Sequence, residues 1–133
     1  MNITKQRFTF SKHDRLCSRK EIETIFESGK SITENSIRLL WKEALFEENI
    51  PLKIAISVPK KKFNKAVDRN KIKRQIREAY RLNRHKVLPE LENSGNKFSA
   101  IIIYTGKKPL AWREMEDKIF VTLQRFAKEA CKK

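Results

Sequence analysis

The stretch KKKFNKAVDRNKIKRQIREAYR, residues 60–81, joins a basic loop to the start of a long helical segment that runs to residue 86. Winding this segment at about 100° per residue separates its side chains into two faces. One face is apolar and consists of Ile72, Ile76, Ala79 and Leu82. The other spans an arc of about 100° without a carboxylate, and it consists of Lys73, Arg84, Arg77, Asn70, Arg81 and Arg74. We call these six residues the basic ridge. The pattern predicts a helix with one side in a core and the ridge on its surface.

The charge of the whole chain is concentrated in this region. The 133 residues include 31 Lys or Arg and 16 Asp or Glu, for a formal net charge of +15. Residues 60–86 alone hold 12 Lys or Arg against Asp68 and Glu78. Such a field attracts polyanions, and the planar arginine fork donates two hydrogen bonds to one phosphate. The ridge therefore favours nucleic acid. A membrane partner is not expected, because the apolar face is modest and better suited to packing on a sheet.

The flanking sequence predicts a small sheet covered by helices. Residues 18–28 form a helix, with Ser18 and Glu21 as a capping box. Residues 35–46, 52–58 and 98–104 are strand-like, and the second of these has one apolar face. Pro89 and residues 93–96 indicate a loop. A final helix follows Pro109, and its apolar stripe consists of Trp112, Met115, Ile119, Leu123, Phe126 and Ala130. We predict an α+β, two-layer sandwich with a small mixed sheet.

Length and composition limit the other possibilities. We expect one domain over residues 1–133, in which residues 1–12 form a flexible arm or residues 4–10 add a strand. No apolar run approaches the roughly 20 residues of a membrane span, and no signal-peptide pattern begins the chain, so a cytoplasmic location is expected. Cys17 and Cys131 are predicted to be reduced thiols.

A catalytic or metal site within the protein is not expected. The histidines, His13 and His85, lie among basic residues. The candidate metal carboxylates match no binding motif, and they are Glu47, Glu48, Glu90 and Glu92. Catalysis by the chain itself would need an activating base or held metal ions, so any chemistry is expected to come from a partner.

Residues 66–81, AVDRNKIKRQIREAYR, resemble the AV-x-RN-x-x-KR-x-x-R signature of the protein component of bacterial ribonuclease P. Arg15 and Leu16, the first helix and the strand at residues 53–59 follow in the family's order. The resemblance implies an α/β sandwich with a left-handed β-α-β crossover. It also implies a small subunit that binds a catalytic RNA and the 5′ leader of precursor tRNA. That ribonucleoprotein removes the leader by magnesium-dependent endonucleolytic cleavage. The RNA performs the chemistry, magnesium is held mainly by the RNA subunit and the substrate, and no obligatory protein partner is implied.

The resemblance also implies two sets of site residues. The RNA-binding set consists of Lys60, Lys61, Lys62, Arg69, Asn70, Lys71, Lys73, Arg74, Arg77 and Arg81. A cleft for the leader lies between the first helix and the sheet, at Ile22, Phe26 and Leu40. Family members commonly place aromatic residues there, and only Phe26 is aromatic in this chain. Either the leader contacts are weaker or another ring such as Trp41 compensates, and Phe26 itself is either a cleft residue or a core residue.

Charge and size alone also allow two other functions. One is a non-catalytic RNA-binding protein of ribosomal or assembly-factor type. The other is a protein that binds double-stranded DNA by placing the arginine-rich helix in the major groove. Preference for ribosomal subunits, for duplex DNA or for leader-bearing tRNA distinguishes the three functions.

Overall fold

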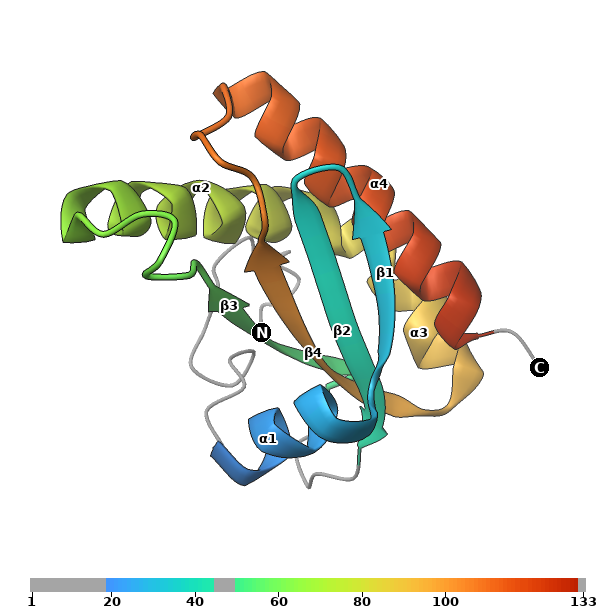
Figure 1. Cartoon of the computed structure of the whole chain (residues 1–133). Coiled ribbons are helices and arrows are strands. Elements are labelled where there is room, and N and C mark those ends of the chain that lie inside the picture. The colour runs from blue at the N-terminus through green and yellow to red at the C-terminus, as the bar shows by residue number, and fades with distance from the viewer. Residues whose placement is uncertain (1–18, 45–49, 132–133) are drawn as a thin grey trace, which may run out of the picture.

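A four-stranded mixed sheet forms the centre of the computed structural model, which describes residues 19–44 and 50–131 (Figure 1). The strands are β1 (Lys30–Glu34), β2 (Ile37–Ala44), β3 (Leu52–Ser57) and β4 (Lys97–Tyr104), in the spatial order β1-β2-β4-β3. β2 is antiparallel to β1 and β4, whereas β3 is parallel to β4. The predicted mixed sheet is confirmed.

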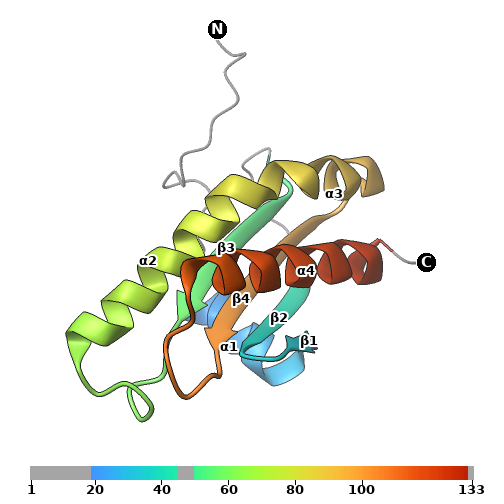
Figure 2. The ribbon, with the colours of Figure 1, turned by 90° about the horizontal axis from the view of Figure 1, so that it is seen from above.

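The helices are divided unequally between the two faces of the sheet. They are α1 (Arg19–Ser28), α2 (Ala66–Asn83), the 3-10 turn η3 (Arg84–Lys86), α3 (Leu88–Ser94) and α4 (Trp112–Ala130). α2, η3 and α3 connect the parallel neighbours β3 and β4. Figure 2 shows α2 and α4 lying across the strands on one side, with α1 behind them. The arrangement is an α+β fold, as predicted.

The larger core lies between the sheet and the α2, α3 and α4 layer. In β3 the predicted alternation is confirmed, because Leu52 and Ile54 are buried in this core and Ile56 packs against it. The buried residues of α4 are Met115, Ile119, Thr122, Leu123, Phe126 and Ala127. Trp112, which the sequence placed on the same stripe, begins α4 and remains 38% exposed. The stripe thus contributes to the core only from Met115 onward.

A smaller cluster lies on the opposite face, beneath α1. Ile25 of α1 contacts Leu40 of β2 and Ile101 of β4, and the partly buried residues around them are Ile22, Ala55 and Ile103. Both faces of the central strands are therefore covered at this point, which explains why residues 39–41 of β2 are all buried.

Two elements differ from the sequence prediction. The first strand begins at Lys30, and Asn35, expected inside a strand, lies in the turn with φ of 49°. Residues expected to form a loop around Pro89 instead form α3, because proline is tolerated in the first helical turn and Leu91 is buried. Gly95, with φ of 78°, ends that helix in the left-handed conformation.

Some predictions concern residues outside the described ranges. They are the arm or strand in residues 1–12, Arg15, Leu16, His13, Cys17, Ser18, Glu47 and Glu48. Within residues 19–44 and 50–131, no helix is both long enough and apolar enough to span a membrane.

Candidate nucleic-acid interface

The core face of α2 is close to the predicted one. Ile72, Ile76 and Ala79 are fully buried, as expected. Leu82 is only partly buried, and Tyr80, at 1% exposure, packs in the core as the larger apolar side chain of that last turn. Leu82 instead faces a groove that it shares with Trp112 of α4. The prediction for Leu82 was wrong because the buried face of α2 also includes Tyr80 and Asn83, which leaves Leu82 at its edge.

The basic ridge on α2 is largely accessible. Asn70 and Arg74 are exposed, and Lys73, Arg77 and Arg81 are partly exposed. Arg84 is an exception, because only 8% of it is exposed. It begins η3, where the backbone tightens from α to 3-10 geometry and the 100° winding no longer applies. Arg84 therefore does not belong to the surface ridge, and the other five residues do.

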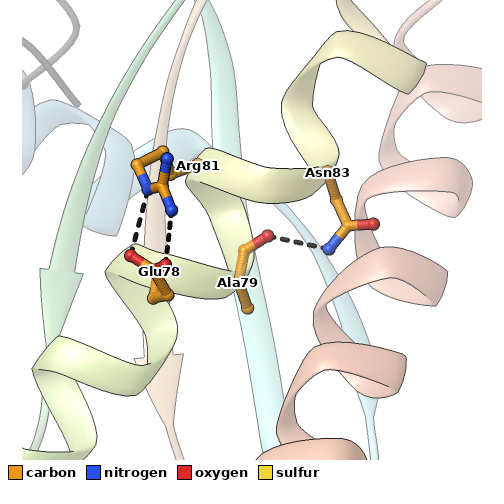
Figure 3. A network of polar contacts seen from close by, with 4 residues as sticks. All are labelled: Glu78, Ala79, Arg81 and Asn83. Carbon is orange, nitrogen blue, oxygen red and sulfur yellow. Dashed lines mark hydrogen bonds and ion pairs between the residues drawn. The ribbon is translucent and has the colours of Figure 1, made fainter. Parts of the chain in front are cut away.

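One ridge cation is paired with a carboxylate from the neighbouring turn. The Nε of Arg81 donates to Oε1 of Glu78 over 3.0 Å, and its Nη2 donates to Oε2 (Figure 3). The hydrogen bond from Arg81 lowers the pKa of Glu78 and raises that of the arginine. Glu78 lies just outside the predicted arc and reaches across to Arg81. The charge of the ridge is thus lower at its C-terminal end than the sequence indicated.

The loop before α2 presents lysines from an anchored backbone. Lys60, Lys61 and Lys62 are exposed, and Lys62 Nζ donates to the Thr105 carbonyl over 2.6 Å. Phe63 is buried with its ring centroid 5.8 Å from that of Tyr104. The loop is therefore fastened to the end of β4, beside the first turn of α2. The exposed Lys71 on α2 extends the same cationic surface.

The three predicted cleft residues lie on the α1 side of the sheet. Leu40 is buried and Ile22 is partly buried in the small cluster. Phe26 is 56% exposed, so it is not a core residue. The structure therefore leaves an accessible aromatic ring on α1, next to the apolar cluster formed with the sheet.

Sequence reasoning missed several cations on this same face. In β2, Arg38 and Lys42 are two residues on either side of Leu40, so all three project to one side of the sheet. Lys53 of β3 lies two residues from Ala55, which packs against the small cluster. Arg38 is exposed, whereas Lys42 Nζ donates to Ser28 Oγ over 2.9 Å. The alternation of residues along β2 could have placed Arg38 and Lys42 on one side of the sheet. It could not show that this side faces α1.

Trp41 does not replace a missing cleft ring. It is 5% exposed in the larger core, on the other face from its neighbour Leu40. Its ring makes edge contacts with Phe98 and Phe126 at centroid distances of 5.8 and 5.4 Å. The suggestion of a compensating role was wrong, because successive residues of a strand point to opposite faces.

The carboxylates of the described residues do not form a metal site. No group of three or more His, Cys, Asp or Glu side chains within residues 19–44 and 50–131 could hold a metal ion. Glu90 and Glu92 are both exposed on the short helix α3. The donor set in this part of the chain therefore does not fit a magnesium ion.

A small mixed sheet with a basic helix over one face and a cationic, partly aromatic surface on the other is typical of a small α+β protein that binds nucleic acid. The family model described as "Ribonuclease P" matches residues 10–127, and this chain belongs to that family. The resemblance recognised in residues 66–81 is confirmed.

Individual relatives and solved structures agree with this assignment. The "Ribonuclease P protein component" of Porphyromonas gingivalis is 41% identical over 78 residues, 59% of this chain and 57% of that relative. The protein of the same name from Geotalea uraniireducens is 30% identical over 92% of this chain and 99% of its own length. The match thus spans little more than half of the first relative but nearly all of the second.

The fold is shared with two solved structures. The RNase P protein from Thermotoga maritima has a TM-score of 0.67 at 25% identity, covering 84% of this chain and 96% of that one. The Staphylococcus aureus RNase P protein has a TM-score of 0.67 at 23% identity, covering 85% and 94%. The likeness to the second structure concerns the fold alone.

Proposed function

We propose that this chain is the protein subunit of the ribonuclease P ribonucleoprotein in the cytoplasm. In this role it binds the catalytic RNA and the 5′ leader of precursor tRNA, and it assists endonucleolytic removal of the leader. The protein contributes no catalytic residue, so it is part of an enzyme whose chemistry the RNA performs. Two findings support this role. The first is membership of the family, and the second, on which the proposal mainly depends, is the accessible basic ridge on α2 within residues 60–81.

The ridge and the lysine loop serve as the surface for the RNA subunit. Like charges at i and i+4, such as Lys73 with Arg77, destabilise an isolated helix, and phosphates relieve that repulsion. Arginine forks and lysine ammonium groups bind phosphate oxygens by charge-assisted hydrogen bonds. The anchored position of Lys60, Lys61 and Lys62 beside the ridge gives one continuous cationic surface for a folded RNA.

The face beside α1 serves as the surface for the single-stranded leader. Phe26 provides an exposed ring on which a base stacks, and Arg38 provides a cation for the backbone. This face lies across the sheet from α2, so one chain contacts two RNA segments at once. Such bridging favours the complex of the RNA subunit with leader-bearing substrate over the complex with mature tRNA.

Magnesium in this proposal is held by phosphates of the RNA subunit and the substrate. The protein acts by screening phosphate repulsion between the RNA subunit and the substrate, and it also raises the affinity for magnesium of sites formed from RNA phosphates. The described residues of the chain contribute cations and hydrogen-bond donors rather than ligands for the metal.

Cleavage of a precursor tRNA with a 5′ leader tests the proposal. The cognate ribonuclease P RNA is assayed at low magnesium with and without the protein, after the RNA has been shown to be active at high magnesium. We expect accurate cleavage at low magnesium only when the protein is present. If the protein gives neither a lower magnesium requirement nor tighter substrate binding, the proposed function is wrong.

A further inference from the structure

A groove of about 520 Å³ lies between α2 and the first turn of α4. Its lining consists of Lys71, Arg74, Gln75, Glu78, Leu82 and Trp112. In Figure 2 the beginning of α4 lies beside the middle of α2, on the side of the sheet away from α1. The groove is therefore separate from the surface proposed for the leader.

Trp112 is the unusual residue of this groove. In the part of the chain that the structure describes, the exposed large apolar side chains are Phe26, Val67 and Trp112. Packing does not require Trp112, because the core contacts of α4 begin at Met115. Exposed aromatic rings in concave surfaces are typical of binding sites, where they supply a large rigid contact area.

The backbone just before Trp112 is tied to α2. Gln75 Nε2 donates a hydrogen bond of 3.4 Å to the carbonyl oxygen of Leu110, two residues before Trp112. The partly buried Leu82 lies in the same lining. A ligand entering the groove thus meets a ring whose backbone is already fixed beside α2, which lowers the entropy cost of ordering this segment on binding.

The polar walls of the groove are cationic. Lys71 and Arg74 are exposed, whereas the carboxylate of Glu78 is occupied by Arg81. An apolar peptide would leave the two cations without partners. An unpaired nucleotide satisfies both parts of the groove, because its base stacks on an aromatic ring while its phosphate binds lysine and arginine.

We propose that this groove binds one unpaired nucleotide of the catalytic RNA subunit, with the base stacked on Trp112 and the phosphate bound by Lys71 and Arg74. The inference rests on the proposed function. The RNA subunit is the source rather than the leader because Arg74 belongs to both the groove and the basic ridge. The groove also lies across the sheet from Phe26 and α1.

The test compares variants of the full chain in binding to the ribonuclease P RNA. Trp112→Ala is expected to weaken binding about tenfold, the order of one base–aromatic stack, and Trp112→Phe to restore most of it. Lys71→Ala is expected to weaken binding and reduce its salt dependence. Lys128→Ala is the matched control, because this exposed lysine lies about 24 Å further along α4 and should behave as the unaltered chain.

Tryptophan fluorescence supplies a second measurement. The chain has two tryptophans, and Trp112→Phe leaves only the buried Trp41. We expect the RNA subunit to quench the fluorescence of the unaltered chain and to leave that of Trp112→Phe unchanged. Thermal unfolding of each variant confirms that it is folded.

The outcomes separate this inference from the proposed function. If the unaltered chain binds the RNA and stimulates cleavage but Trp112→Ala and Lys71→Ala bind equally well, the groove proposal is wrong and the proposed function stands. Quenching by precursor tRNA alone, without quenching by the RNA subunit, overturns the assigned source. If the unaltered chain neither binds the RNA nor stimulates cleavage, the proposed function itself is wrong.

Discussion

The guanidinium of Arg69 in the first turn of α2 donates a hydrogen bond of 2.7 Å from Nη1 to the carbonyl oxygen of Phe63. Phe63 is buried against Tyr104 at the end of β4. Arg69 therefore joins the lysine loop to the helix that carries the basic ridge. Arg74, one turn further on, is exposed. These two arginines of the family signature are expected to respond differently to substitution.

Arg69→Ala should lower both stability and RNA affinity, whereas Arg74→Ala should lower RNA affinity alone. Loss of the hydrogen bond to Phe63 costs about 1 kcal/mol of unfolding free energy. Loss of one contact between an arginine and an RNA phosphate should reduce the magnitude of the slope of log affinity against log salt concentration by about 0.7–0.9. Urea unfolding and RNA binding over a range of salt concentrations provide the two measurements. Unchanged salt dependence in both variants would place the ridge away from RNA.

Phe26→Ala should leave stability nearly unchanged, because the side chain is 56% exposed. It should weaken binding of leader-bearing precursor tRNA by about 1–3 kcal/mol, the contribution of one stacked base. Mature tRNA, which lacks the leader, should bind the holoenzyme as before. Phe26→Tyr keeps the ring and should retain most of the affinity. An equal loss for both RNA ligands would contradict a role in leader binding.

Glu78→Gln removes the carboxylate that binds Arg81 and should strengthen RNA binding at low salt. Without that carboxylate the guanidinium becomes more available to a phosphate, so the salt slope should steepen by up to about 0.9. The stability cost should be small, because the pair is exposed to solvent. Affinity that is unchanged at every salt concentration would show that Arg81 lies outside the interface.

The same pair predicts a pH dependence of stability. The pKa of Glu78 is lowered from its ordinary value of 4.5, mainly by the hydrogen bond from Arg81. A lowered carboxyl pKa in the folded chain stabilises it above the ordinary value, and this contribution is lost as the pH falls through the lowered pKa. The difference in unfolding free energy between the unaltered chain and Glu78→Gln should therefore shrink below about pH 4.5. Denaturant unfolding at several pH values measures that difference, and one that stays constant would argue against the ion pair.

Gly29→Ala should destabilise the fold by about 1–3 kcal/mol, the usual range for overpacking. A Cβ at this position would lie 2.6 Å from the carbonyl oxygen of Ile25 and 2.9 Å from that of Trp41. Both are backbone atoms, so α1 would have to move away from β2. Thermal unfolding measures the effect.

Gly95→Ala serves as the comparison for Gly29→Ala. A Cβ on Gly95 meets nothing within 4 Å, but its φ of 78° is unfavourable for alanine by about 1–2 kcal/mol. Gly95→Ala should therefore destabilise α3 without altering the surface around α1. If Gly29→Ala preserved both stability and leader binding, the close approach of α1 to β2 would not be required.

Much of the α2 side was predictable because its signals are local and repeated. Cationic and apolar residues recur over successive helical turns, so Ile72, Ile76 and Ala79 were correctly placed in the core and Arg74 on the surface. The signature in residues 66–81 identified the family without any tertiary information. Alternation in β3 likewise predicted its buried face, since period-two patterns are read directly from the residues.

The placement of other residues depended on contacts between distant segments. Residues 39–41 of β2 are all apolar because the strand is covered on both faces. Their pattern therefore does not show which residues face which side of the sheet. Only the position of α1 shows that Leu40 lies in the small cluster and Trp41 in the larger core. The change to 3-10 geometry at Arg84 and the start of the α4 core at Met115, not at Trp112, also depend on packing. The sequence by itself thus determined the charge, the family and the basic face of α2. Only the tertiary structure decided which rings are accessible to RNA, because exposure depends on what neighbouring elements cover.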